Sequence, residues 1–217
     1  MSFNYAQFNG PNLEKLFRTW HEILGWYEDE TEDFPYWYLE RTNIGHLALA
    51  VYQRDGIAVQ EFSCLKGKEA EDSSGRADLY MKVPMGRGKS RPVELNIEAK
   101  QQWCSVAFNA NSKAALATYL SRAEKDCRNL KDKAWRADLG AGIVFLLPYS
   151  KSVPTDRKDI RKQLKQFTVA VSKESKKLGA SFAAFHYPAL DNLLEISKNF
   201  SEHGWCPGIT VIGKFVK

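Results

Sequence analysis

Two segments of alternating polarity decide the fold: GRADLYMKV at residues 75–83 and VELNIEAKQQ at residues 93–102. Alternation at every second residue is typical of a β-strand with one face toward the core and one toward polar surroundings. The residues between them are rich in glycine and serine, so the two strands are expected to form a hairpin. The apolar face of this hairpin carries Ala77, Leu79, Met81, Val83, Leu95, Ile97 and Ala99.

The loop of the hairpin sets the pairing of its strands. If the loop is centred on Gly88, the numbers of paired residues sum to about 176, which puts Asp78 opposite Glu98. Two carboxylates facing each other across a strand pair repel, and a divalent cation between them reverses the sign of that interaction. Carboxylate oxygens are hard ligands that suit Mg²⁺, with Mn²⁺ as a substitute. The polar face of the hairpin is therefore a candidate metal site.

Lys100 follows Glu98 on the same face of the second strand and completes the tripeptide Glu98-Ala99-Lys100. A bound metal can activate a water molecule. A neighbouring lysine can orient that water, help to deprotonate it, or neutralise charge on a phosphate. Two further tripeptides of this type, at residues 156–158 and 174–176, fall in a basic helical pattern where opposite charges are ordinary solvated pairs. The alternative interpretation of residues 78–100 is a solvated hairpin face with incidental charges.

The remaining pattern predicts an α/β fold with a mixed central sheet flanked by helices. A first helix is expected from Asn12 to a stop at Gly25, followed by an acidic loop at residues 28–33. We expect one domain over residues 1–217, with an N-terminal extension at 1–36, a core at 37–150 and C-terminal additions at 151–217. The other expected helices are 37–53, 112–133 and 156–178, and the expected strands are 57–65, 76–84, 92–103, 142–148, 181–187 and 209–215.

The order helix, three strands, helix, strand, with Asp78 and Glu98-Ala99-Lys100 on successive strands, resembles the restriction-endonuclease-like PD-(D/E)xK nuclease superfamily. The resemblance covers residues 37–150 and implies an αβββαβ core. It implies a metal-dependent nuclease in which Asp78 and Glu98 bind the metal and Lys100 is the catalytic lysine. It also implies a glutamate on the preceding helix, for which Glu40 matches in position and Glu22 is a weaker candidate. Ala77 stands where many members have proline, and Gln102 resembles a polar residue that touches phosphate or water.

The net charge of +5 hides an asymmetry along the chain. Residues 1–75 carry 6 basic and 13 acidic side chains, whereas residues 76–217 carry 25 basic and 13 acidic ones. A basic region can attract a polyanion, although solvated faces can also segregate in this way. The side chains expected to contact nucleic acid are those of the hairpin loop and of the basic helix: Arg87, Lys89, Arg91, Lys158, Arg161, Lys162 and Lys165.

Several classes of protein are disfavoured by the sequence. The four cysteines lie far apart without a C-x-x-C pair, which argues against a zinc ribbon or a thioredoxin-like site. Residues 1–5 show no basic region followed by an apolar one, so no secretory signal is expected. The apolar run at residues 141–149 is far shorter than the ~20 residues of a membrane span. We therefore expect a soluble, cytoplasmic protein with reduced thiols.

Two functions from different classes follow. The first is a Mg²⁺-dependent DNA endonuclease of a restriction, phage-defence or repair type, with RNA as a substrate that the sequence does not separate from DNA. Cutting a duplex needs two active sites, so a homodimer is plausible. The second is a catalytically silent protein that keeps the nuclease fold. It would bind nucleic acid, or bind or inhibit a protein partner through the acidic N-terminal region. Eleven aromatic residues fall within the first 38 positions of that region.

Overall fold

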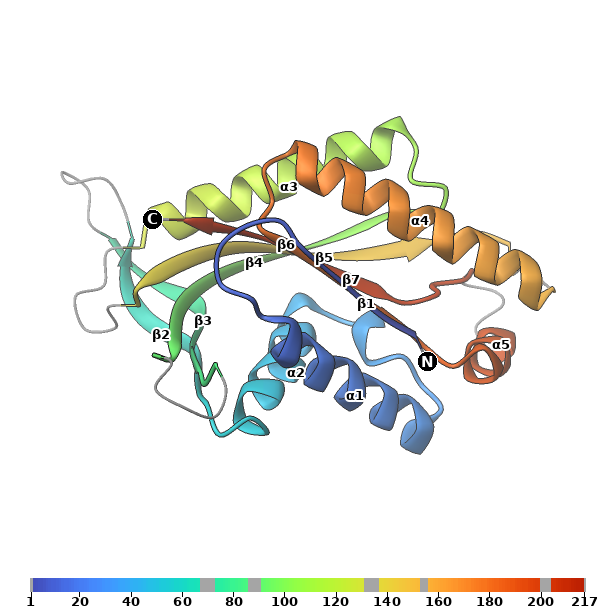
Figure 1. Ribbon diagram of the computed structural model, residues 1–217, viewed down its shortest axis with the longest axis horizontal. Helices are drawn as coiled ribbons and strands as arrows, with labels where there is room; N and C mark the ends of the chain where they lie inside the picture. The colour runs from blue at the N-terminus through green and yellow to red at the C-terminus, as the bar shows by residue number, and fades with distance from the viewer. Residues whose placement is uncertain are drawn as a thin grey trace.

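A seven-stranded mixed sheet forms the centre of the computed structural model, which describes residues 2–66, 73–85, 91–130, 137–152, 156–199 and 204–216. Figure 1 shows this sheet between two layers of helices. In chain order the elements are β1 (Ser2–Gln7), α1 (Glu14–Thr31), a short 3-10 helix η1 (Pro35–Trp37), α2 (Glu40–Tyr52), β2 (Ile57–Lys66), β3 (Ser73–Val83), β4 (Val93–Ser105), α3 (Ala110–Arg128), β5 (Leu139–Tyr149), α4 (Arg157–Lys177), β6 (Phe182–Tyr187), α5 (Leu190–Asn199) and β7 (Ile209–Val216).

The strands lie in the order β1-β6-β7-β5-β4-β3-β2. β2, β3 and β4 pair antiparallel in sequence order, and α3 then crosses over so that β5 pairs parallel with β4. β7 is antiparallel to both β5 and β6, and β1 is antiparallel to β6. The expectation of an α/β fold with a mixed sheet flanked by helices is thereby confirmed, and α2 to β5 follow one another as αβββαβ.

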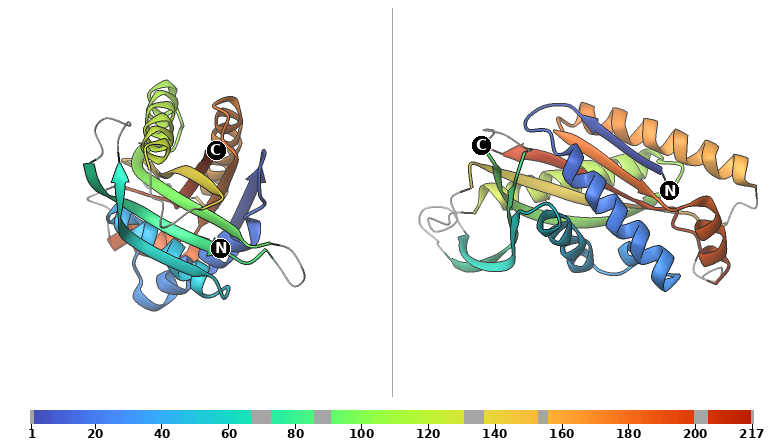
Figure 2. Two further views of the ribbon diagram at one scale, coloured as in Figure 1. Left: turned by 90° about the vertical axis from the view of Figure 1, so that its left-hand side faces the viewer. Right: turned by 60° about the horizontal axis from the view of Figure 1, so that its bottom comes forward.

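α1 and α2 cover one face of the sheet, and α3 and α4 cover the other (Figures 1 and 2). The apolar side chains of α1 recur at helical spacing, so that Leu16, Phe17, Trp20 and Leu24 all face the core. β5 is covered on both faces, and its residues from Ala141 to Pro148 are buried without alternation. This is the pattern of a central strand in a sheet packed between helices.

The predicted hairpin register is confirmed. Leu79 pairs with Ile97 and Val83 pairs with Val93, and in each pair the residue numbers sum to 176. Tyr80 and Lys82 both contact Glu94, as the alternation predicts for the polar face. The prediction is not met for Ala77, because it packs with the buried Tyr80 in a second apolar cluster that also contains Phe62 and Cys64. The paired ladder ends at Leu79 and Ile97.

The N-terminal region differs from the prediction in two respects. Residues 2–7 form the edge strand β1, which the sequence pattern does not predict. The stop expected at Gly25 is wrong, because α1 continues to Thr31 through a stretch in which Leu24, Gly25 and Glu28 are buried. Four aromatic side chains from this region are buried in the core, those of Phe17, Trp20, Phe34 and Tyr36. Four more are partly buried against it, those of Phe3, Tyr5, Phe8 and Trp37.

Buried polar side chains of α1 and β6 are in hydrogen-bonding contact with each other. The Nδ1 atoms of His21 and His186 lie 2.7 Å apart, and Nε2 of His186 lies 2.8 Å from Oε1 of Glu28. Burial, followed by the neighbouring His186, lowers the pKa of His21 to about 3.

The four cysteines are all buried. Among the described residues, none of the helices combines the length and the apolar character that crossing a membrane requires.

Candidate active site

The candidate site begins where the β3–β4 ladder ends. Beyond Leu79 and Ile97, Oδ2 of Asp78 accepts a hydrogen bond of 2.7 Å from the backbone N–H of Ala99. On the other side of β3, the position facing Asp78 is held by Glu61, whose φ of 48° is left-handed. The irregular backbone at Glu61 interrupts the pairing of β2 with β3 and bends these two strands, which are curved in Figure 1.

Glu40 enters this region from the first turn of α2. Burial raises the pKa of its carboxyl group, and the charge of Asp78 raises it further. The ammonium group of Lys100 and a hydrogen bond from the backbone of Gln101 act in the opposite direction. The carboxylates of Glu40 and Asp78 are therefore close enough to influence each other, although they come from a helix and a strand far apart in the sequence.

Lys100 lies among three acidic side chains. Its Nζ is 3.0 Å from Oδ2 of Asp126 on α3. Burial lowers the pKa of Lys100, but the hydrogen bond and charge of Asp126 and the charges of Asp78 and Glu40 outweigh it, so the net shift is upward. Lys100 is consequently a cation at neutral pH, and it suits the stabilisation of negative charge better than the removal of a proton.

Glu98 lies deeper than the other predicted residues. Its side chain is 2% exposed, and its charge raises the pKa of the Cys127 thiol on α3, where burial is the larger cause. On β5 the residue paired with Glu98 is Gly142, where an added Cβ would lie 2.4 Å from the backbone nitrogen of Glu124. The glycine thus allows α3 to pack directly over this part of the sheet, above Glu98.

A metal ion of the Mg²⁺ type fits the donor chemistry of this cluster. Glu40 and Asp78 supply hard carboxylate oxygens whose mutual repulsion a cation would relieve. Within the described ranges, no group of three or more His, Cys, Asp or Glu side chains is arranged to hold a metal. Mg²⁺ is commonly held by one or two carboxylates together with water and substrate phosphate, so two carboxylates match its needs.

Asp126 and Gln101 belong to the site but were missed by sequence reasoning. Gln101 points to the opposite face from Lys100, where its side chain accepts a hydrogen bond of 2.9 Å from Asn43 Nδ2 and donates one of 2.9 Å to the Tyr38 carbonyl. These bonds hold the start of α2, and therefore Glu40, against β4. The alternation of β4 predicts the side of the sheet that Gln101 faces, whereas nothing in the sequence links Asp126 to Lys100.

The predicted nucleic-acid contacts are distributed over two separate regions. Gln102 is half-buried on β4, and Arg91 is exposed just before that strand, whereas Arg87 and Lys89 lie outside the described residues. The other four are exposed on α4, which packs on β6, and β7 and β5 separate that strand from β4. They are Lys158, Arg161, Lys162 and Lys165.

The structure distinguishes the two helix glutamates considered for the site, Glu40 and Glu22. Glu40, on α2, is the one whose pKa responds to Asp78 and Lys100. Glu22 is exposed on α1.

Comparisons with protein-family models, with curated proteins and with solved structures found no match.

Proposed function

We propose that this protein is a metal-dependent phosphodiesterase that cuts DNA, with a restriction-endonuclease-like core formed by α2, β2, β3, β4, α3 and β5. The observation that carries the proposal is the meeting of Glu40, Asp78 and Lys100 at the break in the β3–β4 ladder. Two mutually repelling, partly buried acids cost free energy, and a solvated hairpin face gains nothing in return. In a site that binds a cation and a phosphate, the cation offsets the repulsion of the acids, and the lysine binds the phosphate.

The residues divide the chemistry between them. Glu40 and Asp78 would hold the metal ion, and the resemblance adds Glu98, which is buried on β4, as a further ligand. When bound, the ion supplies an activated water and neutralises charge on the phosphate. Lys100 places a fixed positive charge beside the same phosphate, which stabilises the additional negative charge of the transition state. Asp126 positions the Lys100 ammonium through its 3.0 Å ion pair.

The charge balance of the chain supports a polyanionic substrate, because residues 76–217 carry 25 basic and 13 acidic side chains. The last turn of α3, which covers β4 and β5, adds no net charge beside the site. Its cations Lys125 and Arg128 are offset by Glu124, which pairs with Arg128 at 2.8 Å, and by Asp126, which pairs with Lys100 at 3.0 Å. We propose DNA as the substrate, and the cleavage assay includes RNA.

The test is cleavage of plasmid DNA and of a labelled RNA in Mg²⁺, Mn²⁺ or EDTA. We expect cutting that requires metal and falls by at least about 100-fold in Asp78→Asn and Lys100→Ala. The matched controls are Lys82→Ala and Glu94→Gln, which remove an ion pair of 2.8 Å on the same face of the hairpin. These two variants should keep wild-type cleavage.

Calorimetric titration with Mn²⁺ measures metal binding independently of cleavage. It therefore shows whether a lack of cleavage comes from the choice of substrate or from the absence of a metal site. We expect binding to the wild type that is lost in Asp78→Asn and Glu40→Gln. Undiminished cleavage in both Asp78→Asn and Lys100→Ala would disprove the assignment. Absence of both Mn²⁺ binding and cleavage would favour the catalytically silent binding protein.

A further inference from the structure

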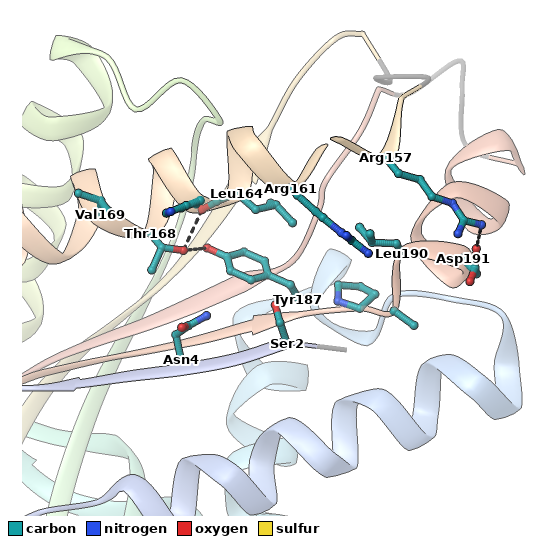
Figure 3. Close-up of a pocket in the computed structure, with 13 residues that line it drawn as sticks. Ser2, Asn4, Arg157, Arg161, Leu164, Thr168, Val169, Tyr187, Leu190 and Asp191 are labelled. Atoms are coloured by element: carbon teal, nitrogen blue, oxygen red, sulfur yellow. Dashed lines mark hydrogen bonds and ion pairs between the residues drawn. The ribbon is translucent and has the colours of Figure 1, made fainter. Parts of the chain in front are cut away.

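A groove of about 740 Å³ lies between α4, the edge strand β1 and the beginning of α5 (Figure 3). One wall comes from α4, and the opposite side comes from Ser2 and Asn4 of β1 and from Tyr187 at the end of β6. In the sheet, β7 and β5 separate β6 from β4, which carries Lys100. The groove is therefore distinct from the candidate active site.

Positive charge dominates the lining of the groove. Arg161 and Lys165 stand one helical turn apart on α4, and Figure 3 shows the Arg161 side chain extending from the helix toward Leu190. Asp191 is the single acidic side chain among the described residues that line the groove, and it is paired with Arg157. Arg161 and Lys165 thus leave an excess of two positive charges facing the groove.

The remaining lining is suited to an organic ligand. Leu164, Val169 and Leu190 supply apolar surface, and the hydroxyl groups of Thr168 and Tyr187 form a hydrogen bond of 2.8 Å. Ligand sites in proteins are typically clefts of roughly 300–1,000 Å³ with mainly apolar walls and a few placed polar groups. The volume and the mixed lining of this groove fall within that description.

One end of the groove is crossed by an ion pair between two helices. Arg157 of α4 binds Asp191 of α5, and Figure 3 shows this contact at the end of the row of lining side chains. A long strand of nucleic acid needs a channel that is open at both ends. A crossed end favours a compact ligand instead.

We propose that this groove is a second binding site, which takes a small phosphate ester of mononucleotide size. Arg161 and Lys165 would bind the phosphate, since guanidinium and ammonium groups form strong, charge-assisted hydrogen bonds with it. Leu164, Val169 and Leu190 would contact the organic part of the ligand, and the polar side chains of β1 would bind its hydroxyl groups. Inorganic phosphate would leave the apolar walls unused, so it should bind more weakly.

The experiment is isothermal titration calorimetry of the full chain with dAMP, deoxyadenosine, inorganic phosphate and a 5′-phosphorylated 12-mer of single-stranded DNA. EDTA is present throughout, so that the result does not depend on the proposed metal site. Arg161→Gln removes one of the phosphate-binding cations. Lys173→Gln is the matched control, because Lys173 is an exposed cation of α4 that does not line the groove. Val169→Trp fills the groove from an exposed position without changing its charge.

We expect saturable dAMP binding with a Kd below about 1 mM. It should weaken about tenfold or more in Arg161→Gln and in Val169→Trp, and stay unchanged in Lys173→Gln. Deoxyadenosine and inorganic phosphate should bind at least about tenfold more weakly than dAMP. Three results would each overturn the proposal: no dAMP binding, equal losses in Arg161→Gln and Lys173→Gln, or Arg161-dependent binding of the 12-mer that is tighter than that of dAMP. The last would make α4 a nucleic-acid surface.

Discussion

The side chain of Asp78 accepts a hydrogen bond of 2.7 Å from the backbone amide of Ala99, at the point where the β3–β4 ladder stops. The Asp78 carboxylate thus accepts the hydrogen bond that a backbone carbonyl would accept if the ladder continued. The same residue influences the ionisation of Glu40 on α2 and of Lys100 on β4. Asp78 therefore has a structural role and a proposed chemical role, which substitutions can separate.

Replacing Asp78 by alanine should destabilise the fold more than replacing it by asparagine. Alanine leaves the amide of the buried Ala99 without its acceptor, at a cost of about 1–3 kcal/mol, whereas the asparagine oxygen can still accept this bond. Urea unfolding of the two variants in EDTA measures the difference. Equal free energies of unfolding would show that the hydrogen bond contributes nothing to stability.

Glu40 should make the metal-free protein lose stability as the pH rises. Its pKa is raised in the folded state, so the folded protein keeps a proton that the unfolded chain has already released. Stability therefore falls between the unfolded pKa, near 4.5, and the higher folded pKa. Glu40→Gln should remove this slope, and unfolding in EDTA at several pH values from 4 to 7.5 tests it. A variant with the wild-type slope over this range would contradict the shift.

Asp126 should set the ionisation of Lys100. Asp126→Asn removes the negative charge that stabilises the ammonium group at 3.0 Å, so the pKa of Lys100 should fall. The titration of the Lys100 Cε resonance by NMR measures this without depending on activity. Glu124→Gln, which removes another acid of α3 whose partners are Arg128 and Lys214, should leave the Lys100 titration in place. If the two variants shift Lys100 equally, the effect is not that of the ion pair.

Gly142 should be indispensable for the packing of α3 over Glu98. An added methyl group would lie 2.4 Å from the backbone nitrogen of Glu124, so Gly142→Ala should cost about 1–3 kcal/mol or more. Gly45→Ala is the control, because its Cβ would meet nothing nearer than 3.9 Å and helical alanine is favoured by about 0.5–1 kcal/mol. Thermal unfolding of both variants compares them. A stable Gly142→Ala protein would mean that α3 can move away from β5.

His21 should stay neutral in the folded protein well below the usual range of histidine. Burial and His186 lower its pKa to about 3, so its ring resonances should not titrate between pH 8 and pH 5. The unfolded chain takes up this proton near pH 6.5, and stability should therefore decline as the pH falls below 6.5 toward 3. NMR assignment with His21→Phe identifies the signal. A midpoint near 6.5 for His21 would refute the prediction.

Local pattern was sufficient for the hairpin and for the order of the main helices and strands from α1 to β6, but not for β1 or α5. The two-residue period of residues 75–83 and 93–102 predicts both strands, and the position of the loop predicts the pairing of Leu79 with Ile97. The physical reason is that a strand's faces and a hairpin's register depend on residues close together in the chain. Asp78, Glu98 and Lys100 could be placed on one face for that reason.

Long-range packing decided the rest. The meeting of Lys100 with Asp126 depends on how α3 docks over the sheet, and the place of β1 beside β6 depends on a pairing across the whole chain. The sequence also places the cations of α4 in the basic part of the chain, but only the strand order separates them from β4 and brings Arg161 and Lys165 to a groove of their own. The period of apolar residues predicts which side of a helix or strand is buried. Which helix or strand packs against that side depends on the shape and chemistry of the complete fold.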